Sequence, residues 1–219
     1  MTNADHAYAF RNSVTGQRDR LRALEAVLDG GTFRRLAECG LGPGWNCLEV
    51  GAGAGSVANW LAERVGLSGW VLATDLDTAL LDDLVHPPIA VQVHDVMTDP
   101  LPEARFDLVH ARLLLAWLPD PALALRRLVA ALKPGGWLVV EDLASHQPFQ
   151  IPAWTSSRPG FFRESSTLTR PSSPSAAGLT RRSGGVYGAC WRKRRSWTSM
   201  RKAGRQCGAA GSRAGSCGG

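Results

Sequence analysis

The 219-residue sequence predicts an α/β fold with a doubly wound, parallel sheet in its first two thirds. Three observations predict this fold. Short apolar runs alternate with amphipathic helical segments up to about residue 145. A glycine-rich turn follows the first apolar run, and a carboxylate follows the second. Parallel strands need long crossover connections, which the helical segments supply, and ligands bind at the carboxyl ends of such strands.

The N-terminal elements are predicted from apolar spacing. Leucines and a valine at three- and four-residue intervals predict a helix over residues 18–28, which Gly30 and Gly31 should end. Thr32 opens a second short helix that Gly40 closes. The apolar run at 47–50 then predicts a buried first strand. We therefore expect N-terminal helices within residues 8–40, ahead of the sheet.

The remaining elements alternate between helix and strand. Asp120 should be the N-cap of the last helix, because Pro121 suits the first helical position. The expected elements are a helix at 57–65, a second strand at 70–74, a helix at 77–85, a third strand at 89–94, a fourth strand at 106–111, a helix at 121–132 and a fifth strand at 137–142.

Charge divides the chain into two parts. Residues 1–150, which we interpret as one domain, hold 12 Lys and Arg against 18 Asp and Glu. Residues 151–219 hold 13 basic residues and a single acidic one, Glu164. The basic isoelectric point therefore comes from the tail and says little about the domain's ligand.

The cysteines and the N-terminus bear on location. The five cysteines form no CxxC pair and no spacing with histidine that suits a metal, so we expect reduced thiols and no metal site. The first ten residues lack a basic segment followed by an apolar one, and no apolar run is long enough to span a membrane. We expect a cytoplasmic protein with no membrane partner.

Residues 48–55, LEVGAGAG, carry the clearest chemistry. Glu49 lies near the end of the first strand, and Gly51, Gly53 and Gly55 lead into a helix. Glycine permits positive φ in a tight turn and lets a ligand approach the backbone, while a helix N-terminus offers N–H groups. A glycine-rich turn without a ligand is the alternative. The strand before, the helix after and the acid at the next strand end favour a binding loop.

Two more carboxylates follow strands. Asp75 lies 20 residues after the last glycine of the loop, where its carboxylate can accept both hydroxyls of a ribose. Asp77 suits the cap of the next helix better than Asp75 does. Asp95 and Val96 follow the third strand, where a carboxylate and an N–H could bind an adenine. An Asp at a strand end is equally often only a turn residue, so both interpretations stay open.

These residues resemble the class I S-adenosylmethionine-dependent methyltransferases, in order and spacing, from about residue 40 to 145. The resemblance implies a Rossmann-like parallel sheet and S-adenosyl-L-methionine as cofactor. It places the aminoacyl end at Glu49 and the glycines, the ribose at Asp75 and the adenine at Leu76, Asp95 and Val96. Its fourth strand matches FDLVHARLLLAWL, with His110 in the wall of the cofactor site, and its fifth matches LKPGGWLVVED at 132–142.

A nicotinamide-binding domain is the close rival. Its third glycine would fall at Ser56, and Glu49 would repel a pyrophosphate but attract the cationic aminoacyl group of S-adenosylmethionine. His110 and Arg112 are candidates for a base and a substrate anchor. Methyl transfer from an activated sulfonium depends mainly on positioning, so we assign no catalytic residue.

The tail from 151 to 219 does not match this pattern. From about residue 154 the periodicity disappears, so we expect a disordered, low-complexity segment that lacks the family's C-terminal antiparallel hairpin. Three interpretations compete: a basic nucleic-acid-binding tail, a disordered linker, and out-of-frame translation of GC-rich DNA. The last is favoured, because Arg, Gly, Ser, Ala, Pro, Cys and Trp are plentiful. It predicts that no tail strand pairs with the fifth strand, and we do not expect a nucleic-acid partner.

Two functions follow from the sequence. The first is a methyltransferase, with methylation of an unidentified small-molecule acceptor. The second is a truncated or inactive pseudo-enzyme that at most binds the cofactor. Without the hairpin that usually completes the substrate wall, we expect an open site and slow methyl transfer.

Overall fold

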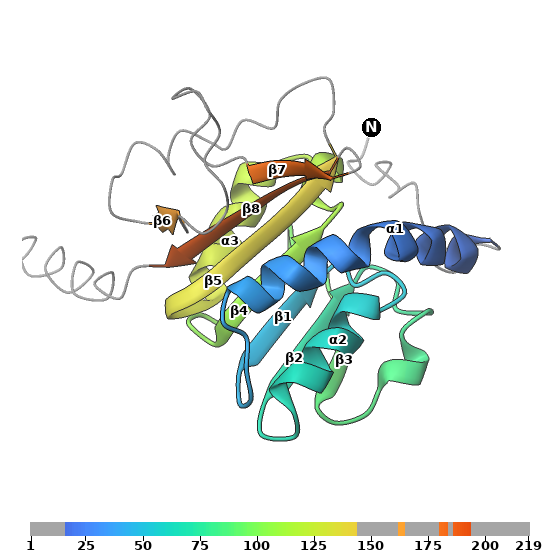
Figure 1. Cartoon of the computed structure of the whole chain (residues 1–219), viewed down its shortest axis with the longest axis horizontal. Coiled ribbons are helices and arrows are strands. Elements are labelled where there is room, and N and C mark those ends of the chain that lie inside the picture. Colours follow the sequence, from blue (N-terminus) through green and yellow to red (C-terminus); the bar gives the residue numbers. More distant parts are fainter. Residues whose placement is uncertain (1–15, 144–161, 165–179, 184–185, 194–219) are drawn as a thin grey trace, which may run out of the picture.

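The computed structural model describes residues 16–143, 162–164, 180–183 and 186–193. Within these residues, eight strands form one sheet in the order β3-β2-β1-β4-β5-β8-β6, with β7 paired to β8 (Figure 1). The first five strands are parallel neighbours. They are β1 (Asn46–Val50), β2 (Trp70–Asp75), β3 (Ile89–Val93), β4 (Phe106–Arg112) and β5 (Leu132–Leu143). This order confirms the predicted parallel α/β sheet.

Helices cover both faces of the sheet. Helices α1 (Gln17–Glu38) and α2 (Ser56–Val65) share one apolar core with residues such as Leu61 and Val71. Helix α3 (Pro121–Ala131) packs on the opposite face, with residues such as Leu128. The Leu123 N–H donates to the Asp120 carboxylate at 2.8 Å, which confirms Asp120 as the N-cap of α3.

The single helix α1 differs from the two short helices predicted at 18–28 and 32–40. It runs through Gly30 and Gly31 without a break. Each interior glycine costs about 1 kcal/mol relative to alanine, but contacts on both sides of the pair offset this cost. Arg112 donates to Asp29 at 2.8 Å before the glycines, and Leu36 is fully buried after them. Residues 8–15 of the predicted helical region lie outside the described residues.

The helix predicted at 77–85 is also wrong. Here the chain forms turns and then the short 3-10 helix η1 (Asp82–Leu84). The Asp75 carboxylate accepts the Asp77 N–H, and the Asp77 carboxylate accepts the Ala79 N–H, each at 3.1 Å. Side chains that satisfy nearby backbone donors in this way compete with helix formation. Asp77 therefore caps a turn.

The tail contributes a strand, which corrects the expectation of a sheet that lacks the C-terminal hairpin. Strand β8 (Val186–Lys193) pairs antiparallel with β5 along seven residue pairs, from Trp137↔Arg192 to Leu143↔Val186. Two short strands, β6 (Phe162–Glu164) and β7 (Thr180–Ser183), pair with β8 in turn. The prediction that no tail strand pairs with the fifth strand is therefore wrong, and the out-of-frame interpretation that made it is not supported.

The side chains of β8 fit both faces of the sheet. Trp191 packs in the core beneath α3, and Cys190 packs in the core beneath α1 and α2. Lys193 is buried and its Nζ donates to the Val129 and Leu132 carbonyls at the end of α3, where a cation is favoured. Cys190 and Trp191 are neighbours that face opposite sides of the sheet and are both buried, so this part of β8 shows no alternation of apolar and polar residues.

Candidate functional site

The loop between β1 and α2 folds tightly against the end of β2. Its three glycines all have positive φ: 73° at Gly51, 59° at Gly53 and 90° at Gly55. The N–H groups of Gly51 and Ala52 donate to the Thr74 carbonyl at 2.8 and 2.9 Å. Any other residue is strained in this left-handed region, so the backbone geometry accounts for the glycines that the sequence singled out.

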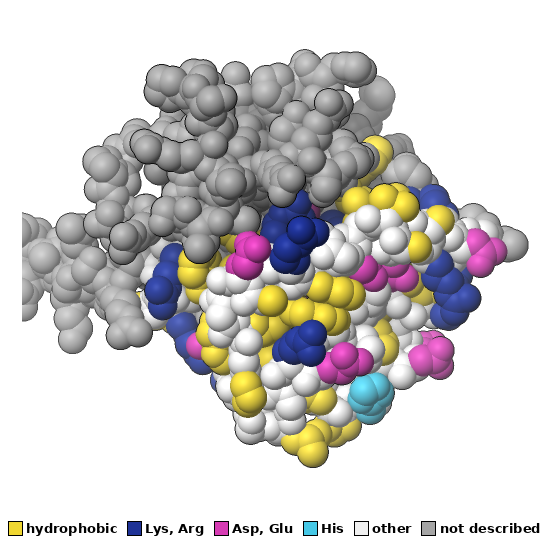
Figure 2. All heavy atoms as spheres, in the orientation of Figure 1, with side chains coloured by type: hydrophobic (Ala, Val, Ile, Leu, Met, Phe, Trp, Pro, Cys, Tyr) yellow, Lys and Arg dark blue, Asp and Glu magenta, His cyan; other side chains and the backbone are white. Residues whose placement is uncertain are grey.

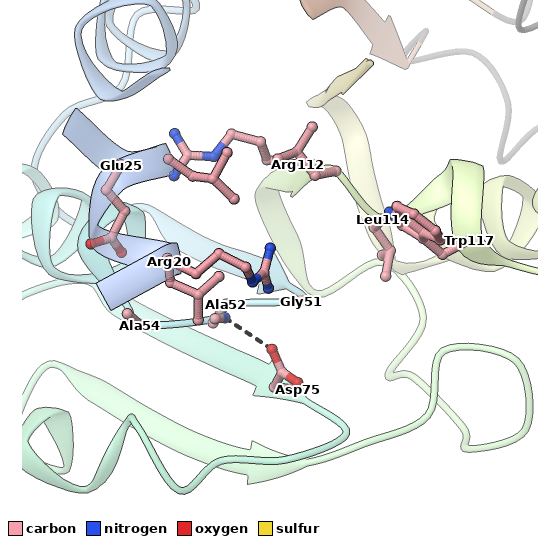
Figure 3. Close-up of a pocket in the computed structure, with 13 residues that line it drawn as sticks. Arg20, Glu25, Gly51, Ala52, Ala54, Asp75, Arg112, Leu114 and Trp117 are labelled. Carbon is pink, nitrogen blue, oxygen red and sulfur yellow. Dashed lines mark hydrogen bonds between the residues drawn. The ribbon is translucent and has the colours of Figure 1, made fainter. Parts of the chain in front are cut away.

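A cavity of about 260 Å³ lies between this loop and α1 (Figure 3). Gly51, Gly53 and Asp75 line it, at the carboxyl ends of β1 and β2. Arg20 reaches from α1 toward Gly51 and Asp75. The lining is completed by Leu21, Leu24, Glu25, Ala52, Ala54, Arg112, Leu113, Leu114 and Trp117.

Asp75 is the buried acid of this cavity. Its carboxylate accepts the Gly53 N–H at 2.9 Å and the Asp77 N–H at 3.1 Å, and thereby joins the glycine loop to the end of β2. Burial raises the pKa of Asp75, and the backbone N–H donors partly oppose that rise. A carboxylate has about four lone-pair positions, so Asp75 can accept a further hydrogen bond beside those from the backbone. Leu76 follows it and is half exposed.

The turn after β3 has its own hydrogen bonds. The Asp95 carboxylate accepts the Met97 N–H at 2.8 Å, and the Asp95 N–H donates to Asp99 at 2.9 Å. Val96 is buried in the core beneath α3. Of the described residues, Asp95 and Val96 are not among those that line the cavity. Asp95 thus has at least the turn role that the sequence left open.

A row of three charged side chains crosses β1, β4 and β5 beneath α1. Glu49 and His110 are directly paired in the parallel register. The Nδ1 atom of His110 lies 2.6 Å from a Glu49 carboxylate oxygen, and its Nε2 atom lies 3.4 Å from a Glu141 oxygen. Ionised carboxylates only accept hydrogen bonds, so both ring nitrogens donate and His110 is an imidazolium.

The ion pairs in this row shift the pKa values of His110 and Glu141 in opposite directions. Burial of the His110 ring opposes its charge, but the adjacent Glu49 carboxylate and the bond to Glu141 raise its pKa to about 9. Burial likewise opposes the charge of Glu141, but its bond to His110 lowers its pKa to about 2. Arg35 also pairs with Glu141, so two cations balance two buried carboxylates.

The same row holds α1 on the sheet. Thr32 and Arg35 of α1 both donate to the Glu141 carboxylate. Arg112, at the end of β4, donates to Asp29 at 2.8 Å and to Thr32 at 3.1 Å. Of the described residues, Glu49 and His110 are not among those that line the cavity. They lie in the layer that supports it.

A family model described as a methyltransferase domain matches residues 17–182, which is most of the chain. The chain belongs to this methyltransferase family. The match begins at α1 and extends past β6 into β7, so it includes part of the tail. It confirms the family that the sequence resembles.

Relatives of this methyltransferase are similar over part of their length. The ubiquinone/menaquinone biosynthesis C-methyltransferase UbiE of Laribacter hongkongensis is 30% identical over 149 residues, which cover 62% of this chain and 57% of the relative. Methyltransferase str2 of Strobilurus tenacellus is 31% identical over 155 residues, 69% of this chain and 54% of the relative. The chain thus spans little more than half the length of these relatives.

Solved structures share the fold of this methyltransferase. A TehB-like SAM-dependent methyltransferase from Corynebacterium glutamicum has a TM-score of 0.59, at 21% identity, over 81% of this chain and 98% of that one. A SAM-dependent methyltransferase from Aquifex aeolicus has a TM-score of 0.54, at 21% identity, over 73% of this chain and 88% of that one. Both confirm the Rossmann-like sheet predicted from the sequence.

Sequence reasoning missed the contacts that support the site of this methyltransferase. Glu141, Thr32, Arg35 and Arg20 were not predicted as site residues. A signal for Glu141 was present, because a charged residue inside the apolar run WLVVED must find a buried partner. No comparable signal marks Thr32 and Arg35, because polar residues on a helix usually face water.

Proposed function

We propose that this methyltransferase binds S-adenosyl-L-methionine in the cavity beneath α1 and transfers its methyl group to a small-molecule acceptor. The observation that carries the proposal is the left-handed glycine loop joined to the buried Asp75 carboxylate at the cavity wall. The cofactor, when bound, supplies a methyl group on a positively charged sulfur. The chain's own residues bind, orient and exclude water.

The residues at the cavity fit this cofactor. The glycine loop lets the aminoacyl portion lie against the bare backbone, and Asp75 accepts hydrogen bonds from the ribose hydroxyls. Arg20 lines the same cavity and is suited to a carboxylate. The wall carries two acidic side chains, Asp75 and Glu25, and two basic ones, Arg20 and Arg112, which suits an aminoacyl group with both an ammonium and a carboxylate.

The adenine end is proposed at the turns after β2 and β3, beside Leu76, Asp95 and Val96. Leu76 is half exposed and offers an apolar surface to a ring. In the same turn as Asp95, His94 is buried and both of its ring nitrogens have no hydrogen-bond partner among the described residues. Buried polar groups normally have partners, so this turn has hydrogen-bonding capacity for a ligand or a water.

Glu49 and His110 have a supporting role in this proposal. The sequence placed Glu49 at the aminoacyl group, yet its carboxylate bonds to His110 at 2.6 Å. We propose that the pair fixes β1 to β4 directly beneath the glycine loop, so that the loop keeps its shape when empty. Displacement at an activated sulfonium depends on positioning, so no general base is assigned.

The acceptor is proposed to be a small molecule that enters beside Trp117. Trp117 lines the cavity, and 51% of it is exposed to solvent. Leu113 and Leu114 extend this apolar side of the cavity. The two relatives described above are methyltransferases, and the name of one places its reaction at a carbon atom in quinone biosynthesis. A small organic acceptor therefore agrees with both the lining and the relatives.

Calorimetry with S-adenosylhomocysteine tests the binding site. Asp75→Ala should weaken binding about tenfold or more, because charge-assisted hydrogen bonds to the ribose are lost. Asp77→Ala is the matched control, since Asp77 forms a turn beside the cavity and should bind within a factor of about three. Equal affinity of Asp75→Ala and the parent would refute the ribose assignment. Binding of NADH without S-adenosylhomocysteine would refute the cofactor.

Turnover separates the enzyme from the alternative, a pseudo-enzyme that only binds the cofactor. A panel of small acceptors is incubated with labelled cofactor, and transfer of the label is measured. Transfer that Asp75→Ala abolishes supports an active enzyme. Binding without any transfer across the panel supports the alternative.

We also propose that the protein acts in the cytoplasm and without nucleic acid. Cys39, Cys47 and Cys190 are free thiols, which favours a reducing compartment. On the face shown in Figure 2, Lys, Arg, Asp and Glu side chains are interspersed over the described residues, and mixed charge attracts phosphate backbones weakly. Among the described residues, no helix is long and apolar enough to cross a membrane, and no cluster is suited to a metal.

A further inference from the structure

Two buried thiols meet where the end of α1 packs against β8. The sulfur atoms of Cys39 and Cys190 lie 3.7 Å apart, although 151 positions separate the two residues in the sequence. Cys39 follows the last residue of α1, and Cys190 lies opposite Val139 of β5. Both are more than nine-tenths buried, in the same apolar core.

We propose that Cys39 and Cys190 are a redox-sensitive pair whose oxidation to a disulfide joins α1 covalently to β8. A disulfide bond is roughly 2.05 Å long, so the sulfur atoms need to approach by roughly 1.7 Å, a movement within reach of side-chain rotation. The proposal does not depend on the proposed cofactor or acceptor. It depends on the position of β8 beside α1.

The oxidation balances with a peroxide as oxidant. The Cys39 sulfur attacks one peroxide oxygen, the oxygen–oxygen bond breaks, and a sulfenic acid and one water form. The Cys190 sulfur then attacks the sulfenic sulfur, the sulfur–sulfur bond forms, and a second water leaves. The two thiols lose two protons and two electrons in total, and hydrogen peroxide takes up both to become two waters.

The surroundings of Cys39 and Cys190 should make their oxidation slow. The hydrogen bond with Cys39, together with burial, raises the pKa of the Cys190 thiol, so little thiolate is present at neutral pH. Oxidation therefore requires transient opening of the contact between α1 and β8. Cys47 lies in the same core but on β1, and burial raises its pKa as well. It is a matched control for a buried thiol in this core.

The disulfide would reinforce the attachment of α1. Arg35 lies one helical turn before Cys39 and pairs with Glu141 of β5. The covalent bond adds a second attachment at the same end of the helix, on the next strand. A link between positions so distant in the sequence restricts the unfolded chain strongly. We expect it to raise the unfolding temperature by roughly 5–10 °C.

The experiment treats the full chain with hydrogen peroxide, blocks remaining thiols with an alkylating agent, and maps disulfides by digestion and mass spectrometry without reductant. Trypsin leaves Cys39 and Cys47 in one peptide, 36–64, and Cys190 in another, 183–192. Mapping in Cys47→Ala therefore identifies Cys39 without ambiguity. The unfolding temperature is measured before oxidation, after oxidation and after reduction with dithiothreitol.

The expected result is a linked peptide pair, 36–64 with 183–192, in both the parent and Cys47→Ala, and an unfolding temperature that rises on oxidation and returns on reduction. Cys190→Ala should lose both the link and the rise. The proposal is overturned if Cys39 and Cys190 are alkylated or oxidised to sulfonic acid while other cysteines pair. It is also overturned if Cys190→Ala shows the same rise as the parent. The peptide map of the parent does not require any variant to fold.

Discussion

The charge on His110 makes a measurable contribution to stability that depends on pH. The free imidazole has a pKa near 6.5, and the buried ion pairs raise the pKa of His110 to about 9. Raising the pKa of His110 from 6.5 to about 9 corresponds to roughly 3 kcal/mol of stability for the folded state. Solvent screening does not reduce this free energy, because His110 is fully buried.

The sign of this effect follows from proton binding. Between pH 6.5 and 9 the folded chain holds a proton on His110 that the unfolded chain has released, so stability falls as pH rises. The contribution is fully present below pH 6.5 and lost above about 9. Glu141 acts at the acidic end of the pH range. Because its pKa is lowered, the stability that the ionised Glu141 contributes is lost as pH falls from 4.5 toward 2. Both shifts describe the same ion pairs and are not added.

The variant His110→Gln tests this reasoning. Glutamine carries no charge and cannot donate to both carboxylates as an imidazolium does, so the variant should be about 3 kcal/mol less stable at pH 6. Urea unfolding at pH 6, 7.5 and 9 should show the difference from the parent shrinking as pH rises. His86→Gln is the control, because His86 is exposed. A difference that stays constant from pH 6 to 9 would contradict the assignment of a buried imidazolium.

Three further predictions concern stability, each measured by urea unfolding. Lys193→Met should lower the free energy of unfolding by about 1–3 kcal/mol, because the last carbonyls of α3 lose a buried hydrogen-bond donor. An unchanged free energy of unfolding would show that this end of β8 does not pack against α3. Trp191→Ala should lower the free energy of unfolding by about 3 kcal/mol, because Trp191 is buried, whereas Trp117→Ala, at a half-exposed site, should lower it by less than about 1 kcal/mol. Equal losses in the two variants would contradict the position of β8. Gly30→Ala should stabilise by roughly 0.5–1 kcal/mol, because the added Cβ meets open space in a helix. Gly55→Ala should destabilise, because φ at this position is 90° and the added Cβ would clash with the Leu84 side chain.

Local patterns predicted the parallel sheet because its signals are short in range. The apolar runs, the glycine loop and the Asp120 cap each lie within a few residues, and each appears where it was expected. Asp75 was also placed at the cavity, because parallel strands bring their carboxyl ends to one edge. Elements that depend on distant contacts were not predictable in this way.

The missed features depend on long-range contacts. The two predicted helices form the single helix α1, and Thr32 at their junction is held by hydrogen bonds with Glu141 and Arg112, which lie 80 or more residues further along the chain. Strand β8 is defined by its place against β5, and its basic, glycine-containing sequence resembles a loop. The role of Glu49 was predicted from its charge alone, because the sequence does not show that His110 would be its partner.

The attachment of α1 is uneven along its length. Hydrogen bonds and ion pairs with α2 and the sheet run along its later turns: Glu25 accepts the Ser56 N–H at 3.2 Å, Asp29 pairs with Arg112, and Thr32 and Arg35 donate to Glu141. Before Glu25, α1 continues for about 12 Å, and Arg20, Leu21 and Leu24 line the cavity from these first turns. The ion pairs of α1 with the sheet, Arg35 with Glu141 and Arg112 with Asp29, lie further along the helix. We therefore expect a ligand to enter by movement of the first turns of α1, while these pairs keep the rest of the helix on the sheet.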